Sequence, residues 1–342
     1  MKVRVKDIAE AAGVSSATVS NALNGKGGVG EDKSKRILSI AREMGYIHER
    51  SALSQRDYIR LVMFKRHGLV VMDTQFFTDM MEAMARETRQ LGYELLITHL
   101  HMEKDPDYLD RIQEICREEC AGIILLATEM YREDVKLFAH TKSPLLVLDS
   151  LFRHDDLNCV VMNNYEAGYL ATQRLALMGH TRIEHITASV RFNNMRYRRK
   201  GFEAAMKDYS LPLEQDFLWK VTPTLEGAYR DMLDLLAQRQ RPLPTAFFAA
   251  NDIIATGCVR AMKEKGVKVP RDVSIIGMDD LDICQIASPP LSSIRVFRDD
   301  MGRVAVRRLV DMMDPKGAHC VQKTELSVVL VDRQSVRDLK EN

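Results

Sequence analysis

Small and polar side chains occupy the outward positions of a short predicted helix near the start of the chain. The helix spans Ser16–Leu23, and its outward groups can reach base edges and phosphates: Ser16, Ala17, Ser20, Asn21. A first helix, Val5–Ala12, and a tight turn at Gly13 precede it. This order of helix, turn and second helix predicts a helix-turn-helix, whose chemistry is the recognition of DNA.

Carboxylates follow several predicted strands, at the strand ends where open α/β sheets bind their ligands. Asp279 comes directly after the strand Val273–Met278, and a carboxylate at such a place commonly accepts sugar hydroxyls. Asp73 and Asp149 end strands nearer the N-terminus, and they are either ligand contacts or ordinary loop carboxylates. Asn251 opens a helix, so it is either a ligand contact or simply the helix cap.

The remaining patterns do not favour catalysis or metal binding. The segment Gly25–Gly30 satisfies GxGxxG, but it follows a helix instead of a strand, so it does not predict dinucleotide binding. Cys116 and Cys120 lie four apart without a nearby His pair of ligand spacing. A nucleophile elbow, a P-loop and an HExxH motif are also missing. We therefore expect no enzyme, no cofactor and no metal.

The predicted elements that position these side chains are of two kinds. A third helix, Asp32–Met44, completes a small helical bundle, and a polar stretch follows it. Beyond that stretch, apolar strands alternate with helices, which predicts parallel sheet covered by helices. The predicted strands are Ile59–Phe64, Glu94–Thr98, Gly122–Leu126, Pro144–Leu148, Cys159–Met162, Arg182–Thr187, Ala246–Ala250, Val273–Met278, Ser293–Phe297 and Leu326–Val331. Periodicity alone leaves open whether they close one barrel or form two doubly wound sheets.

Length and composition agree with a chain of several structural units. The chain has 342 residues, which is more than one core normally holds. Its composition, 46% hydrophobic and 28% charged, is that of an ordinary globular protein. Residues 1–58 carry ten Lys and Arg against seven Asp and Glu, so a slightly basic head precedes a nearly neutral body. The N-terminus lacks the apolar run of a signal peptide, and the six Cys are irregularly spaced, so we expect a cytoplasmic protein with free thiols.

The N-terminal segment closely resembles the signature of the LacI/GalR family of bacterial transcription regulators. The match covers about forty residues, with the turn, both caps and the core of the third helix, Ile37 to Tyr46, in register. Further segments match that family in order along the chain: Phe76-Phe77, Leu145–Asp149, Asn163–Gly168, Arg198–Phe202, Ala250–Asp252, Val273–Asp280 and Pro289–Ile294. The resemblance implies two periplasmic-binding-protein-like lobes with a ligand cleft between them, which favours two doubly wound sheets over a barrel.

The resemblance also implies domain bounds and site residues. We expect a helix-turn-helix domain at 1–46, a hinge at 47–58 and an effector-binding and dimerisation core at 59–342. Within the core, the first lobe is expected at 59–161 and 293–319, and the second at 162–292 and 320–336. The implied effector contacts are Asp73, Phe77, Asp149, Arg198, Thr222, Asn251 and Asp279, with Arg198 at the family's effector-holding arginine. The expected DNA contacts are Ser15, Ser16, Ala17, Thr18, Ser20, Asn21, Lys33, Arg36, Arg50 and Gln55.

The hinge departs from the family pattern. His48 and Gln55 stand where the family usually has a Pro and a Leu that wedges into the minor groove. Extra residues follow the first strand, and Lys65–Gly68 are expected to form a basic hairpin beside the hinge. Arg60, Lys65 and Arg66 would then replace the missing wedge through phosphate contacts.

These observations predict a homodimeric, sequence-specific repressor of carbohydrate genes whose DNA affinity follows a small effector. The C-terminal stretch 333–342 lacks leucine heptads, so a tetramerising coil is not expected. The alternatives are a solute-binding receptor, against which the helix-turn-helix weighs, and a sugar-modifying α/β enzyme, which would need a nucleophile or metal.

Overall fold

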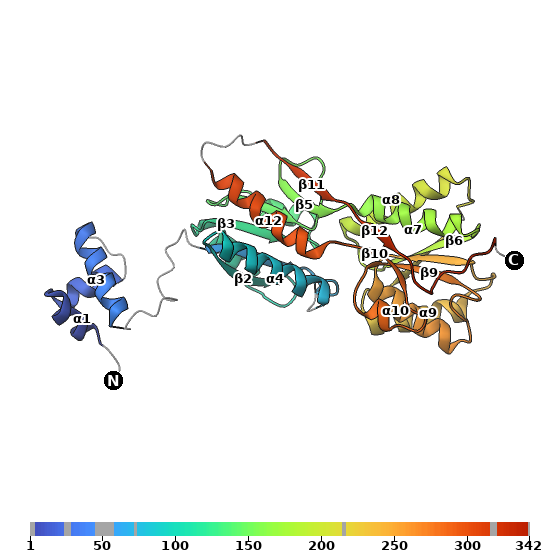
Figure 1. Ribbon diagram of the computed structural model, residues 1–342, viewed down its shortest axis with the longest axis horizontal. Helices are drawn as coiled ribbons and strands as arrows, with labels where there is room; N and C mark the ends of the chain where they lie inside the picture. Colours follow the sequence, from blue (N-terminus) through green and yellow to red (C-terminus); the bar gives the residue numbers. More distant parts are fainter. Residues whose placement is uncertain are drawn as a thin grey trace. The chain divides into compact units, whose positions relative to one another are not determined.

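The computed structural model describes residues 4–23, 29–44, 58–71, 74–213, 217–314 and 320–340. The chain divides into two compact units, Met1–Asp57 and Tyr58–Asn342, called here the small and the large unit. Figure 1 labels many of their helices and strands. No helix among these residues is long and apolar enough to cross a membrane.

The small unit is a bundle of the three predicted helices. They span α1 (Val5–Ala12), α2 (Ser16–Leu23) and α3 (Glu31–Glu43), as the sequence predicts to within one residue. Its apolar core consists of buried side chains from all three: Ile8, Ala9, Val19, Ala22, Ile37 and Ala41. Gly13 takes φ 66° after α1, a left-handed conformation that glycine adopts without a steric cost.

The large unit contains two six-stranded sheets, and each defines a lobe. The first lobe has the strand order β11-β5-β4-β3-β1-β2, and all its neighbouring strands are parallel. Its strands are β1 (Tyr58–Lys65), β2 (Glu94–His101), β3 (Gly122–Leu126), β4 (Leu145–Leu148), β5 (Asn158–Met162) and β11 (Lys323–Leu326). Parallel pairing on both sides buries β3 completely, which explains its uninterrupted apolar sequence.

The second lobe has the order β12-β10-β9-β8-β6-β7, in which only the β10–β12 pair is antiparallel among the described strands. Its strands are β6 (Ile183–Ala188), β7 (Leu218–Val221), β8 (Ala246–Ala249), β9 (Ser274–Asp279), β10 (Ser292–Arg295) and β12 (Val329–Val331). These two sheets confirm the doubly wound, two-lobed fold class.

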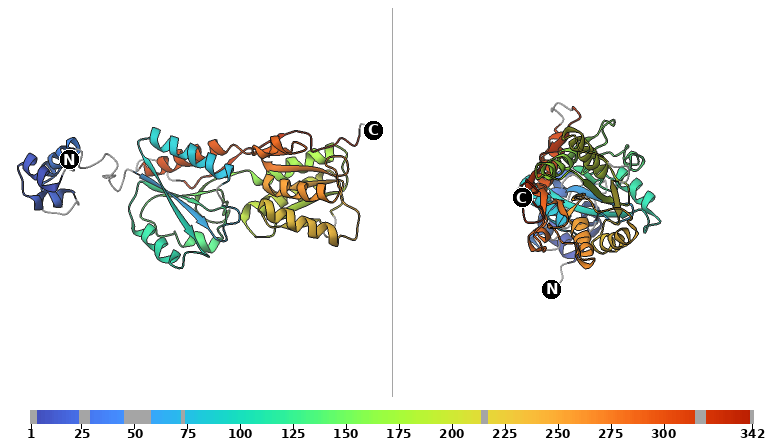
Figure 2. Two further views of the ribbon diagram at one scale, coloured as in Figure 1. Left: turned by 90° about the horizontal axis from the view of Figure 1, so that it is seen from below. Right: turned by 90° about the vertical axis from the view of Figure 1, so that its right-hand side faces the viewer.

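Helices cover both faces of each sheet, because alternate strand residues point to opposite sides. In β1, Ile59 and Leu61 belong to the core under α4 and α12, whereas Val62 and Phe64 pack with residues of α5. In the second lobe, α7 and α8 lie on one side of the sheet and α9 and α10 on the other (Figures 1 and 2). The helices of the large unit are α4 (Gln75–Gln90), α5 (Tyr108–Arg117), α6 (Arg132–Lys136), α7 (Asn164–Leu177), α8 (Asn193–Asp208), α9 (Leu225–Gln238), α10 (Asp252–Glu264), α11 (Ile283–Ile286) and α12 (Arg298–Met313).

The chain crosses between the lobes at places that differ from the expected lobe bounds. Strand β10 pairs with β9, so the second lobe extends through Arg295 instead of ending at 292. Strand β11 pairs with β5, so residues 323–326 return to the first lobe. The single expected strand Leu326–Val331 is therefore wrong: it is the end of β11 and the whole of β12, in different sheets. Apolar character identified the segment, but only hydrogen-bond partners decide its sheet.

The expected basic hairpin at Lys65–Gly68 is also wrong. Lys65 ends β1, and Arg66 donates to both carboxylate oxygens of Asp134 while stacking over the Tyr131 ring, 4.2 Å from its centroid. Arg60 is buried and donates to Glu118 at 2.6 Å. Two of the three cations expected to contact phosphates are thus held in ion pairs inside the first lobe.

His185 provides a prediction for the pH dependence of stability. It is buried between Phe202 and Phe248, its Nδ1 donates to the Phe248 carbonyl at 2.9 Å, and burial lowers its pKa to about 4. Because the unfolded pKa is 6.5, this group stabilises the fold fully above pH 6.5 and less as pH falls towards 4. We expect His185→Phe to reduce the difference in unfolding free energy between pH 7 and pH 4 by about 3 kcal/mol. Urea titrations at several pH values measure it, and His154→Phe, at an exposed position, should leave the difference unaltered.

Candidate functional site

A cavity of about 210 Å³ lies between the two lobes, at the carboxyl ends of their strands. Asp149 follows β4 and Thr128 lies shortly after β3 in the first lobe, whereas Asn251 follows β8 and Asp279 ends β9 in the second. Parallel strands bring these ends to one edge of each sheet, and the two edges face each other across the cavity. Polar groups distant in sequence therefore meet in one place.

Arg198 on α8 is the central cation of this site, and it is buried. Its Nε donates to Asn164 Oδ1 at 2.8 Å, its Nη1 donates to the Ala250 carbonyl, and its Nη2 approaches the Met162 sulfur. Burial lowers the pKa of Arg198, while Asp279, Asp149 and Asp252 oppose that shift by their charges. The guanidinium is thus held largely by the protein itself, which limits what it can donate to a ligand.

Asp149 is buried and already hydrogen-bonded. Its Oδ2 accepts from Thr128 Oγ1 at 2.7 Å, and its Oδ1 accepts from Asn194 Nδ2 at 3.1 Å. Burial raises its pKa to about 6, although those donors and Arg198 lower it in part. Since Asn194 belongs to the second lobe, this contact also links the two lobes beside the cavity.

Asp279 has an unused acceptor. Its Oδ1 is buried and has no hydrogen-bond partner among the residues that the structure describes. Burial raises its pKa to about 7, with Arg198 acting in the opposite direction. Its backbone has φ 109°, an unusual conformation for a side chain with a Cβ, which is typical of functional positions. A buried acceptor of this kind can accept a hydrogen bond from a bound ligand.

Apolar side chains form the remaining walls of the cavity. Phe76 and Phe77 are packed edge to face, with ring centroids 5.0 Å apart, at the start of α4. Other apolar lining residues are Leu69, Val70, Met162, Phe192, Met195, Leu225, Ile253 and Leu281. The cavity thus combines hydrophobic walls with a few convergent polar groups, as small-molecule sites do.

The structure places most of the expected effector residues in this cavity. Its lining includes Phe77, Asp149, Arg198, Asn251 and Asp279. Asn251 also caps α10, because its Oδ1 accepts the Ile254 N–H at 2.8 Å. Thr222 does not line it: its N–H donates to Asp231, and the next residues, Pro223 and Thr224, line the cavity instead. Asp73 lies outside the described residues.

Sequence reasoning missed Asn194 and Thr128, which hold Asp149. Neither belongs to a motif of its own, and their partner lies 45 and 21 positions away in sequence. The doublet Asn193-Asn194 opens α8, and Asn near the start of a helix is a signal only for capping. Nothing in its pattern indicates a contact across the cleft.

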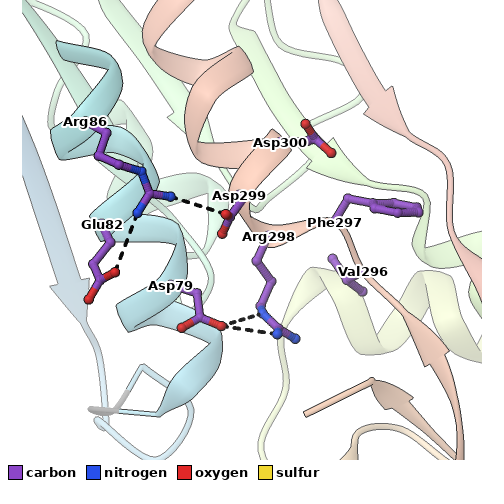
Figure 3. Close-up of a pocket in the computed structure, with 8 residues that line it drawn as sticks. All are labelled: Asp79, Glu82, Arg86, Val296, Phe297, Arg298, Asp299 and Asp300. Carbon is purple, nitrogen blue, oxygen red and sulfur yellow. Dashed lines mark hydrogen bonds and ion pairs between the residues drawn. The ribbon is translucent and has the colours of Figure 1, made fainter. Parts of the chain in front are cut away.

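A second, more open hollow of about 420 Å³ lies between α4 and the start of α12. Figure 3 shows ion pairs between charged side chains that line it: Arg298 with Asp79, and Arg86 with both Glu82 and Asp299. Arg298 also donates to the backbone carbonyl of Asp279 at 2.8 Å. The hollow is therefore lined by ion pairs. Through its contacts with Asp79 and the Asp279 carbonyl, Arg298 connects α4 of the first lobe to the end of β9 in the second.

In the small unit, the expected DNA contacts lie on α2 and α3. Ser16, Ala17 and Ser20 are exposed and Asn21 is half-buried on α2, while Lys33 and Arg36 are exposed on α3. Ser15 caps α2, because its Oγ accepts the Thr18 N–H at 3.1 Å, and the two hydroxyl oxygens lie 2.8 Å apart. Ser15 and Thr18 thus have a structural role. Arg50 and Gln55 lie outside the described residues.

Two family models match the chain. The lacI family of bacterial regulatory proteins matches residues 4–49, and a periplasmic binding protein-like domain matches residues 172–336. The HTH-type transcriptional repressor PurR of Actinobacillus pleuropneumoniae serotype 3 (strain JL03) is 32% identical over 340 residues, covering 98% of each chain. The repressor of the same name from Haemophilus influenzae (strain PittEE) is 28% identical, covering 98% of this chain and 99% of its own.

Solved structures share the fold. The lac repressor dimer bound to operator and the anti-inducer ONPF has TM-score 0.78 and 21% identity, covering 98% of this chain and 100% of its own. A complex of the transcriptional regulator CelR with cellobiose has TM-score 0.73 and 22% identity, covering 97% and 99%. A LacI family regulator from Enterococcus faecium with bound ribose has TM-score 0.69 and 24% identity, covering 82% and 99%.

Proposed function

The chain belongs to the LacI family of bacterial regulatory proteins, and we propose from its cavity which kind of effector controls it. Membership makes it a DNA-binding transcriptional repressor regulated by a small effector, and not an enzyme. We propose that the effector is an uncharged molecule rich in hydroxyl groups, such as a small sugar, and that it binds between the lobes. The unpartnered Oδ1 of Asp279 carries this proposal.

Charge supports an uncharged effector. Two buried carboxylates, Asp149 and Asp279, face the cavity together with one cation, Arg198. The donors of Arg198 are mostly engaged by Asn164 and Ala250, so they are poorly placed to neutralise a phosphate or carboxylate on a ligand. An anionic effector would therefore meet like charge from buried carboxylates. Hydroxyl groups, by contrast, donate readily to carboxylates.

Size and wall chemistry support a small effector. The volume of about 210 Å³ lies below the roughly 300–1,000 Å³ of typical ligand pockets. Phe76, Phe77 and Phe192 offer apolar surfaces for the carbon faces of a ring, while Asp279 and Thr224 offer polar edges. Ribose and cellobiose occupy two of the similar structures, and sugars of this kind are the first probes to test.

For operator DNA, we propose that α2 reads bases and α3 contacts phosphates. Ser16, Ala17 and Asn21 present short groups on α2, and an Asn side chain can pair with adenine in the major groove. Lys33 and Arg36 are exposed cations on α3. A homodimer in the cytoplasm, placing two such helices on a two-fold operator, is the arrangement expected of the family. An effector that prefers one arrangement of the lobes then shifts the population of DNA-competent dimer.

A pair of variants tests the two halves of this proposal. Operator sites are selected from random DNA with the purified repressor, and thermal shift measures binding of ribose, cellobiose, glucose 6-phosphate and adenine. We expect Asp279→Asn to weaken sugar binding at least about tenfold while operator affinity is retained. We expect Asn21→Ala to lose about 1–3 kcal/mol at one operator position while sugar binding is retained.

Sugar affinity measured at several pH values tests the same proposal. A hydroxyl that donates to Asp279 binds its ionised form, so sugar affinity should rise as pH increases through about 7. Tighter binding of glucose 6-phosphate or adenine than of either sugar, or an Asp279→Asn variant with unaltered sugar affinity, would contradict the proposed effector class.

A further inference from the structure

A buried glutamate in the first lobe gathers an unusual number of backbone donors. Glu129 lies just after β3, and its side chain is buried. Its Oε2 accepts three backbone N–H groups and its Oε1 accepts two, from Arg66 (2.8 Å), His67 (3.1 Å), Gly68 (2.9 Å), Val70 (2.8 Å) and Val71 (2.8 Å). The segment 66–71, which follows β1, is therefore folded around a single carboxylate.

The carboxylate of Glu129 is held chiefly by these five backbone N–H groups. The neighbouring Arg66 donates to Asp134 instead. His67 Nδ1 lies 3.3 Å from Glu129 Oε2 and also accepts the Leu69 N–H at 3.1 Å. Converging backbone N–H groups can hold an anion in this way. Because a buried carboxylate without donors is very unfavourable, the segment and the glutamate depend on each other.

The same segment supplies a wall of the cavity between the lobes. Leu69 and Val70 line the cavity. Val70 packs against the core cluster of the second lobe that contains Phe192, whereas Val71 is buried in the cluster that contains Phe76 and Phe77. The fold around Glu129 thus determines where Leu69 and Val70 lie in the wall of the cavity.

We propose that Glu129 is a positioning residue that sets the size of ligand the cavity accepts, by folding segment 66–71 so that Leu69 and Val70 close one side. This inference rests on the proposed function of the cavity as the effector site. Glu129 touches no ligand itself, so it acts through the placement of the wall.

Hydrogen–deuterium exchange on the full-length protein tests the positioning step. Glu129→Gln keeps the side-chain size but replaces one acceptor oxygen with an NH₂ group, so two or three backbone N–H groups lose their acceptor. We expect amides of segment 66–71 to exchange at least about tenfold faster in this variant. Glu133→Gln, the same change at an exposed position nearby, should leave them unaltered. Equal exchange in the two variants would overturn the inference.

Ligand selectivity tests the wall itself, with ribose as the small probe and cellobiose as the large one. We expect Leu69→Ala and Val70→Ala, which keep Glu129, to raise cellobiose affinity relative to ribose by about tenfold or more. Glu129→Gln should lower ribose affinity and shift the ratio in the same direction. Faster exchange with an unaltered ratio would show that the segment does not set the size limit, and would overturn the inference alone. A wild-type protein that binds neither sugar would instead refute the proposed effector class, and this inference with it.

Discussion

Replacing Arg198 with alanine is expected to lower the free energy of unfolding of the large unit by about 3–5 kcal/mol and to abolish the response to effector. The guanidinium is the buried cation among the carboxylates of Asp149, Asp252 and Asp279. Its removal takes away a positive charge that faces those carboxylates, and it leaves Asn164 Oδ1 and the Ala250 carbonyl without this donor. Removing a buried charge that faces buried opposite charges costs far more than removing an exposed one.

Urea unfolding followed by the fluorescence of Trp219, the single tryptophan, measures this loss. Arg199→Ala is the matched control, because Arg199 is the next residue on α8 and its side chain is 46% exposed, paired with Glu203. The loss in Arg198→Ala should be larger at pH 8 than at pH 5, since the carboxylates can take up protons at the lower pH. A loss under about 1 kcal/mol, equal to that of the control, would contradict the account of Arg198 as the charge that holds the site together.

The second large effect is expected at the crossing of α7 and α8. A Cβ placed on Gly201 would overlap the Tyr165 carbonyl oxygen, and one on Gly168 would overlap the Arg198 carbonyl oxygen. These two glycines let the backbones of α7 and α8 come into contact. They thereby fix the distance between α7 and the helix that carries Arg198. Gly201→Ala should therefore lower the unfolding free energy by about 3 kcal/mol, even though alanine favours the helix by about 1 kcal/mol.

The same urea titration measures the effect, with Lys200→Ala at the adjacent exposed position as the control. Because α8 must move away from α7 to admit the methyl group, sugar affinity should fall together with stability. Stability within about 1 kcal/mol of wild type would mean that the helices separate freely, and that their close approach does not position Arg198.

The sequence by itself determined the local elements and the family. The helices of the small unit follow from caps and glycine at fixed offsets, such as Ser15 and Gly13, which act within one turn of the chain. Strand positions in the large unit follow from apolar runs, with two exceptions. The short strand β7 alternates buried and more exposed residues, and the segment 326–331 divides between β11 and β12. Asp149 and Asp279 were identified because a strand end is visible in sequence.

Only the tertiary structure decided what those residues contact. Arg66 looked like a free cation for phosphate, but its partner Asp134 lies 68 positions away. Glu129 carried no motif, yet it organises a wall of the site through hydrogen bonds to backbone groups that are identical in every residue but proline. Strands β11 and β12 are separated by two residues and belong to different sheets. Pairing of this kind depends on which groups meet after the chain has folded, because local pattern fixes which face of an element is apolar but not which partner covers it.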